Sequence, residues 1–170
     1  MMYKIVGTAL VILSCGGVGF NAASAHKREV RLLKELITSI HYMKCELEYR
    51  STPLPELLGK TAKISSGHMQ AFFLRLVQVL QSQIFPDPGS CCAHVIAQNK
   101  ILPASVRDII MTVGATLGQF DLQGQLDGLQ LAIAHAEELL EKLTTDQDNR
   151  LRNYQTLGLC AGAALAILLV

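Results

Sequence analysis

The chain has 170 residues, of which 50% are hydrophobic and 5% aromatic, and this length suits one folded domain. Its 15 basic and 14 acidic side chains leave a formal net charge of +1, so no overall field favours binding to nucleic acid or another acidic polymer. The apolar residues are unevenly distributed, with the longest uncharged runs near the two ends of the chain.

Residues 5–25 and 154–170 contain no charged side chain. As a helix the first run would reach about 31 Å, roughly the thickness of the hydrocarbon layer of a bilayer, and the second is at the short limit for a span. We therefore predict a transmembrane helix over residues 1–25, a cytoplasmic helical-bundle domain over 26–153 and a second transmembrane helix over 154–170. Gly158 and Gly162 form a GxxxG pattern, which predicts close packing of the second span against another helix.

Residues 23–25, Ala-Ser-Ala, also suit a signal-peptidase site, which leaves two alternatives for the first run. Cleavage after Ala25 would export the body and leave Arg150 and Arg152 outside the cell, against the positive-inside rule. Retention of both runs places the basic residues that flank the body on the cytoplasmic side and leaves only Lys4 and the amino terminus outside. The basic residues after the first run are Lys27, Arg28, Arg31 and Lys34. Their number favours two spans and a cytoplasmic body.

Between the two runs, helical periodicity predicts a long helix over residues 27–49. Its apolar positions recur at steps of three and four, and they are Leu33, Leu36, Ile40, Met43 and Leu47. Pro53 and Pro55 interrupt this pattern. A short helix is expected to begin near Pro53, with Ser51 or Thr52 as its N-cap.

Further helices are expected over residues 68–83, 90–98 and 103–117, before a turn marked by Gly118 and a cap at Asp121. The last helix begins at Leu122 and continues into the terminal apolar run. Its apolar seam consists of Leu122, Leu126, Leu129, Ile133, Ala136, Leu140 and Leu143. We find no strand alternation, so the predicted fold class is all-α: an antiparallel bundle of about six helices with a transmembrane helix at each end.

The sequence contains none of the common phosphate-binding, nucleophile-elbow or zinc-helix motifs. Cys91, Cys92 and His94 are the nearest approach to a metal cluster, and they lack the paired spacing that such sites use. We therefore expect no catalytic residue, no metal and no cofactor. The acidic run Glu137, Glu138 and Glu141 allows two interpretations, a solvated helix face or a surface for a basic partner.

Three segments, "ELEYRSTPLPELL" at 46–58, "LGQFDLQGQ" at 117–125 and "NYQTLGLCAGAALAILLV" at 153–170, together resemble the stage III sporulation protein AB family. The motif residues of the two turns are Tyr49, Thr52, Pro53, Leu54, Leu117, Gly118, Asp121 and Gln125. Most of them suit architectural roles: Thr52 and Asp121 as caps, Gly118 as a helix end, Pro53 as the reversal of the chain, and Gln125 as a residue that bonds near the second turn.

The resemblance implies a sporulation protein of the mother-cell membrane, within a secretion-like channel complex that links mother cell and forespore. It also implies a body similar to the platform protein of type II secretion systems, a cytoplasmic ATPase as partner, and membrane channel subunits as neighbours; self-association is left open. The hypothetical ATPase-binding residues are Glu46, Glu48, Glu137, Glu138 and Glu141. The alternative function is an exported helical bundle that senses or binds a ligand and is anchored by its C-terminal helix.

Overall fold

The computed structural model describes the backbone of residues 2–99, 101–118 and 121–169, and the side chains of residues 25–99, 101–118 and 121–145. The described residues form six helices and no strand, which confirms the predicted all-α class. The helices are α1 (Met2–Arg50), α2 (Leu54–Ile64), α3 (Gly67–Gln81), α4 (Pro88–Gln98), α5 (Ala104–Thr116) and α6 (Leu122–Leu169).

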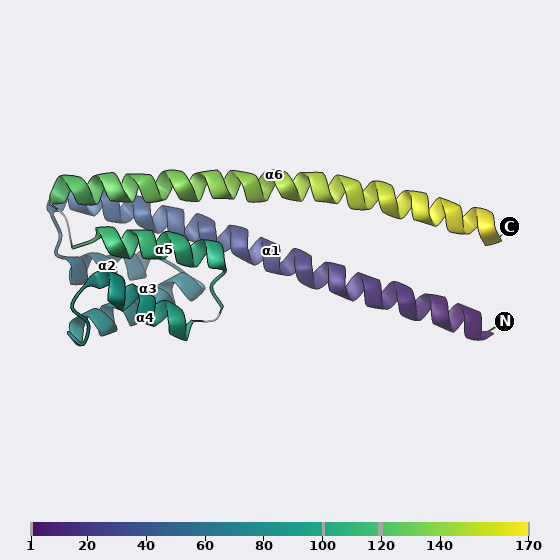
Figure 1. Cartoon of the computed structure of the whole chain (residues 1–170), viewed down its shortest axis with the longest axis horizontal. Helices are drawn as coiled ribbons and strands as arrows, with labels where there is room; N and C mark the ends of the chain where they lie inside the picture. Colours follow the sequence, from purple (N-terminus) through teal and green to yellow (C-terminus); the bar gives the residue numbers. More distant parts are fainter. Residues whose placement is uncertain (1, 100, 119–120, 170) are drawn as a thin grey trace.

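Two long helices, α1 and α6, form the frame of the molecule (Figure 1). They run antiparallel, and both continue past the four short helices toward the end at which the chain termini lie. The short helices pack in succession beside this pair. We call the end with the α1–α2 and α5–α6 turns the distal end, and the end with the α2–α3 and α4–α5 connections the proximal end.

Hydrogen bonds between α1 and the proximal connections show how the short helices align along α1. At the α2–α3 turn, the hydroxyl groups of Ser65 and Ser39 lie 3.0 Å apart. At the start of α5, the Ser105 hydroxyl donates to Glu29. Residue 29 precedes residue 39 on a helix that runs toward the distal end. The α4–α5 connection therefore lies nearer to the terminal apolar runs than the α2–α3 turn does.

The core lies where the predicted seams face one another. All five seam residues of α1 are buried, and so are Leu129, Ile133 and Ala136 of α6. Leu126, Leu140 and Leu143 are partly buried against this core. The prediction was wrong for Leu122, whose side chain is 42% exposed. Leu122 is the first residue of α6, at the tip of the bundle, so fewer helices surround it.

Two glycines let α5 lie close to the helices on either side of it. An added Cβ at Gly114 would lie 2.7 Å from the Cys92 Sγ of α4, and one at Gly128 of α6 would lie 2.0 Å from the Thr116 Cγ2 of α5. Real Cβ atoms do not approach other atoms so closely. These two positions therefore set the spacing of α4, α5 and α6.

Within the part of the chain whose side chains are described, no helix is both long and apolar enough to cross a membrane. The predicted spans over 1–25 and 154–170 fall outside that part, apart from Ala25, as do Gly158, Gly162 and the basic residues at 150 and 152. The helical backbone of α1 and α6 continues through both runs. The proposed domain boundaries at 25 and 153 therefore coincide with no break in either helix.

Candidate functional site

The turns that carry the motifs at 46–58 and 117–125 meet at the distal end. Gly118 marks the contact: an added Cβ there would lie 3.2 Å from the Pro88 Cγ and 3.5 Å from the Leu54 Cδ2. Leu117, beside Gly118, is buried in the core. Two motifs far apart in the sequence thus form one structural unit, which we call the distal tip and define as residues 46–54, 117–118 and 121–125.

The α1–α2 turn reverses the chain within a few residues. Ser51 has a φ of 48°, and its N–H donates to the Leu47 carbonyl at 3.1 Å. Pro53 then occupies the N-cap position of α2 with φ −57°, an angle to which its ring already restricts it. The prediction that Ser51 or Thr52 caps α2 was wrong, because no side chain caps this helix. The predicted role of Pro53 in the reversal is confirmed.

The Thr52 hydroxyl instead binds a carboxylate on α1. Thr52 Oγ1 donates to Glu46 Oε2 at 3.0 Å, and Lys60 Nζ of α2 donates to the same oxygen at 2.9 Å. Arg50 Nη1 lies 3.7 Å from the other Glu46 oxygen. The Glu46 side chain is only 11% exposed, so the carboxylate lies inside the turn and ties α1 to α2.

These contacts also set the charge states of Glu46 and Lys60. The hydrogen bond from Lys60, helped by that from Thr52 and by the nearby positive charges, holds the pKa of Glu46 below its ordinary value despite the opposing effect of burial. The same hydrogen bond, with a second that Lys60 donates to Glu56, raises the pKa of Lys60. Both groups are therefore charged at neutral pH. Glu46 stabilises the tip, whereas the sequence assigned it to partner binding.

The α5–α6 turn has the predicted architecture. Gly118, just past the end of α5, has a φ of +75°, the left-handed conformation that favours glycine at a helix end. The Asp121 Oδ1 accepts a hydrogen bond from the Gly124 N–H at 2.9 Å, which confirms Asp121 as the N-cap of α6. The Gln125 N–H donates to the Asp121 carbonyl at 3.0 Å.

The solvent-facing side of the tip combines apolar and acidic groups. Tyr49 is 81% exposed, which is the largest exposure of any big hydrophobic side chain among the described residues. Leu122, at the start of α6, is exposed at the same tip, and Glu48 and Asp121 are exposed as well. Exposed tyrosines next to apolar and charged groups are typical of protein interfaces.

The acidic residues of α6 form a separate surface. Glu137, Glu138 and Glu141 are exposed, and the Glu137 Oε1 lies 3.7 Å from the His41 Nε2 of α1. Because His41 precedes Glu48 by two helical turns, the α6 acidic group lies roughly 10 Å closer to the proximal end than Glu48 does. The structure thus separates the five acidic candidates into a partly buried residue at 46, an exposed tip residue at 48 and a group on α6.

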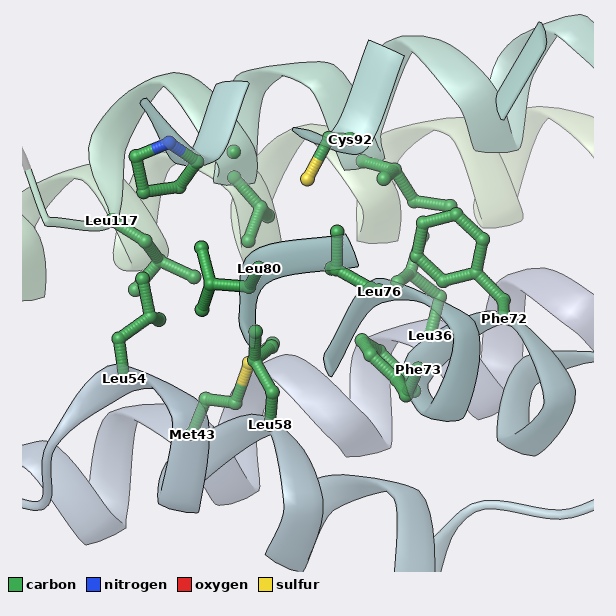
Figure 2. Close-up of a pocket in the computed structure, with 14 residues that line it drawn as sticks. Leu36, Met43, Leu54, Leu58, Phe72, Phe73, Leu76, Leu80, Cys92 and Leu117 are labelled. Atoms are coloured by element: carbon green, nitrogen blue, oxygen red, sulfur yellow. The ribbon is translucent and has the colours of Figure 1, made fainter. Parts of the chain in front are cut away.

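The cavity shown in Figure 2 offers no room for a substrate. The cavity drawn there has a volume of about 20 Å³, space for roughly one water, and its walls are apolar side chains from helices α1 to α5 and the turn after α5, among them Leu36, Phe72 and Leu117. Burial raises the pKa of Cys92, on the cavity wall, to about 12, so its thiol stays protonated. Among the described residues, no group of three His, Cys, Asp or Glu side chains is placed to hold a metal ion.

A comparison with family models decides the family, because the model described as stage III sporulation protein AB matches residues 4–170. The chain belongs to the stage III sporulation protein AB family. A relative named stage III sporulation protein AB, from Bacillus subtilis (strain 168), is 23% identical over 177 residues, which cover 99% of this chain and 100% of the relative. A solved structure of a stage III sporulation protein AB has a TM-score of 0.62 at 21% identity, and covers 72% of this chain and 98% of its own.

Membership of the stage III sporulation protein AB family makes this a sporulation protein, and the solved structure supports the bundle fold independently. In this member of the family, the sequence did not single out Lys60, which completes the Glu46 site. Its only signal is the spacing of Glu56 and Lys60, a pair four residues apart on a short helix. The glycines at 114 and 128 carried no signal, since their neighbours come from other helices.

Proposed function

We propose that this chain is a non-enzymatic platform component of the channel complex between mother cell and forespore, and that its distal tip docks a cytoplasmic ATPase. The observation that carries the proposal is the exposed pair Tyr49 and Glu48 at the end of α1, next to a turn held from within by Glu46 and Lys60. Leu122, at the start of α6, is exposed at the same tip. Because the turn is already held in one conformation, less conformational entropy is lost when a partner binds there.

The position of the tip supports this role. Both apolar runs leave the bundle on its proximal side, so the tip is the part of the body farthest from them (Figure 1). From residue 25 to the end of α1 at Arg50, the helix rises by about 38 Å. A surface so far from the apolar runs is accessible to a large soluble partner.

For localisation we propose the mother-cell membrane, with two spans over residues 1–25 and 154–170 and a cytoplasmic body. The charge distribution in the flanks supports this topology. In this arrangement Gly158 and Gly162 would pack the second span against membrane channel subunits or a second copy of the chain.

Binding of the purified ATPase to full-length chain in detergent tests the docking surface. Tyr49→Ala and Glu48→Lys should each weaken binding by about tenfold or more, the usual effect of removing an interface hot spot. Glu137→Lys and Glu141→Lys serve as matched charge reversals away from the tip, and they should change the affinity by less than about twofold. If the two α6 variants lost as much affinity as the two tip variants, docking at the tip would be refuted. Circular dichroism checks that all four variants keep their helicity.

Thiol labelling in intact cells tests the topology. Cys45 is exposed, whereas Cys91 and Cys92 are buried, so Cys45 reports the side of the membrane when Cys15 and Cys160 are replaced by alanine. Labelling by an impermeant maleimide only after lysis would support a cytoplasmic body. Labelling before lysis would favour the alternative function, an exported bundle that senses or binds a ligand.

A further inference from the structure

The part of α1 that follows the first apolar run separates its charges between two sides. Its exposed basic residues are Lys27, Arg28, Arg31 and Lys34. Its two acidic residues, Glu29 and Glu35, are partly buried and accept hydrogen bonds from Ser105 and Ser66 of the short helices. Within the described residues, none of the four basic side chains forms an ion pair. The exposed side chains of this segment are thus mostly basic, because its acidic side chains face the short helices.

The basic residues are also ordered along the helix. Lys27, Arg31 and Lys34 are spaced by four and three residues, so they lie in one stripe along α1. Arg28 lies beside this stripe. The stripe begins two residues after Ala25, where the uncharged run ends. Positive charges are thereby concentrated immediately beside an apolar segment.

An exposed apolar side chain lies at the same end of the bundle. Ile101, in the α4–α5 connection, is 47% exposed, and its N–H donates to the Asn99 Oδ1 at 3.3 Å. The bond from Ser105 to Glu29 places this connection beside residue 29, roughly 6 Å along α1 from Ala25. Figure 1 shows the connection at the proximal end of the bundle.

We propose that the proximal end of the body rests on a membrane surface of anionic phospholipid, with the α1 stripe on the phosphate groups and Ile101 inserted among the headgroups. This inference rests on the proposed two-span topology and adds the lipid class that the body recognises. Clusters of basic residues beside a span attract anionic lipid, and an apolar side chain at the same depth adds insertion. We assign a lipid surface as the ligand because the basic residues of the stripe directly follow an uncharged apolar run.

The chain contains no tryptophan, so a single tryptophan can report the depth of one position. Ile101→Trp places the probe in the α4–α5 connection. Ile64→Trp is the matched control: Ile64 is also an isoleucine, is 49% exposed, and lies beside the Ser65–Ser39 contact, roughly 10 to 15 Å farther along α1. Each full-length variant is reconstituted into vesicles of phosphatidylcholine with or without phosphatidylglycerol, and quenching by brominated lipid is measured.

With phosphatidylglycerol present, the residue-101 probe should be quenched at least about twofold more than the residue-64 probe. The excess should fall at high salt, in vesicles of phosphatidylcholine alone, and when Lys27→Gln and Arg31→Gln are added. Because the lipid and salt comparisons use one variant against itself, they do not depend on equal stability of the two variants.

Three results would overturn the inference. Equal quenching of the two probes in vesicles that carry the chain would refute it and leave the two-span topology standing. Quenching at residue 101 that is independent of phosphatidylglycerol would show insertion without recognition of anionic lipid. Failure of the chain to float with vesicles would refute the proposed topology and the inference together.

Discussion

Gly128 lies on the face of α6 that packs against the last turn of α5, and replacing it by alanine should destabilise the bundle. The added Cβ would lie 2.0 Å from the Thr116 Cγ2, whereas an ordinary van der Waals contact begins at 3.4 Å. The helices must therefore separate by roughly 1.5 Å, or Thr116 must rotate and lose its 2.8 Å hydrogen bond to the Thr112 carbonyl.

The free energy of unfolding reflects two opposing effects of this substitution. Overpacking of a well-filled contact costs about 1–3 kcal/mol. Replacing a glycine within a helix by alanine returns about 1 kcal/mol through helix propensity. We expect a net loss of up to about 2 kcal/mol, which lowers the thermal midpoint by up to about 8 °C for a chain of this size.

Gly59→Ala is the matched control, because Gly59 is inside helix α2 and has no atom within 4 Å of its added Cβ. It should gain the helix-propensity term alone and raise the midpoint by about 2–4 °C. Thermal unfolding followed by circular dichroism on the full chain in one detergent measures both variants. A further variant, Thr116→Ser in the Gly128→Ala background, removes the closest methyl group and should recover part of the loss. Equal midpoints for Gly128→Ala and Gly59→Ala would refute the proposed close contact.

Three other predictions concern the distal tip and the core. Gly118→Ala should lose about 1–2 kcal/mol in thermal unfolding, because a φ of +75° disfavours any side chain; an unchanged midpoint would contradict this turn. The lowered pKa of Glu46 means that its contribution to stability is complete above the ordinary pKa of 4.5 and is lost as pH falls through the lower folded value. The midpoint should therefore fall more steeply below pH 4.5 in the parent chain than in Glu46→Gln, and parallel curves would refute the pairing. With both cysteines of the apolar runs replaced by alanine, Cys45 should react with a thiol reagent at neutral pH and Cys92 only after unfolding, and equal rates would contradict the burial of Cys92.

The helices could be predicted because periodicity depends only on neighbours along the chain. All five predicted α1 seam residues from Leu33 to Leu47 are buried, since a step of three and four residues specifies one face of a helix. The cap at Asp121 and the helix end at Gly118 were also predicted, because each depends on its own residue type and local backbone.

The contacts between distant segments could not be predicted in this way. Thr52 has the residue type of an N-cap, yet it binds Glu46, because Pro53 occupies the cap position and a carboxylate of α1 lies within reach. The role of Glu46 depends on Lys60, which is on another helix. The exposure of Leu122 depends on where the bundle ends in space. None of these facts is encoded in the spacing of residues along one helix.

The continuity of α1 through residue 25 has a mechanical consequence. This helix has 49 residues and a length of about 74 Å, and it has no coil between the tip and the first apolar run. α6 is similarly continuous through residue 153. A flexible linker would absorb a force applied at one end, whereas an uninterrupted helix is stiff along its length. We therefore expect a torque applied to the turn after Arg50 to reach both apolar runs, because neither helix has a break that could absorb it.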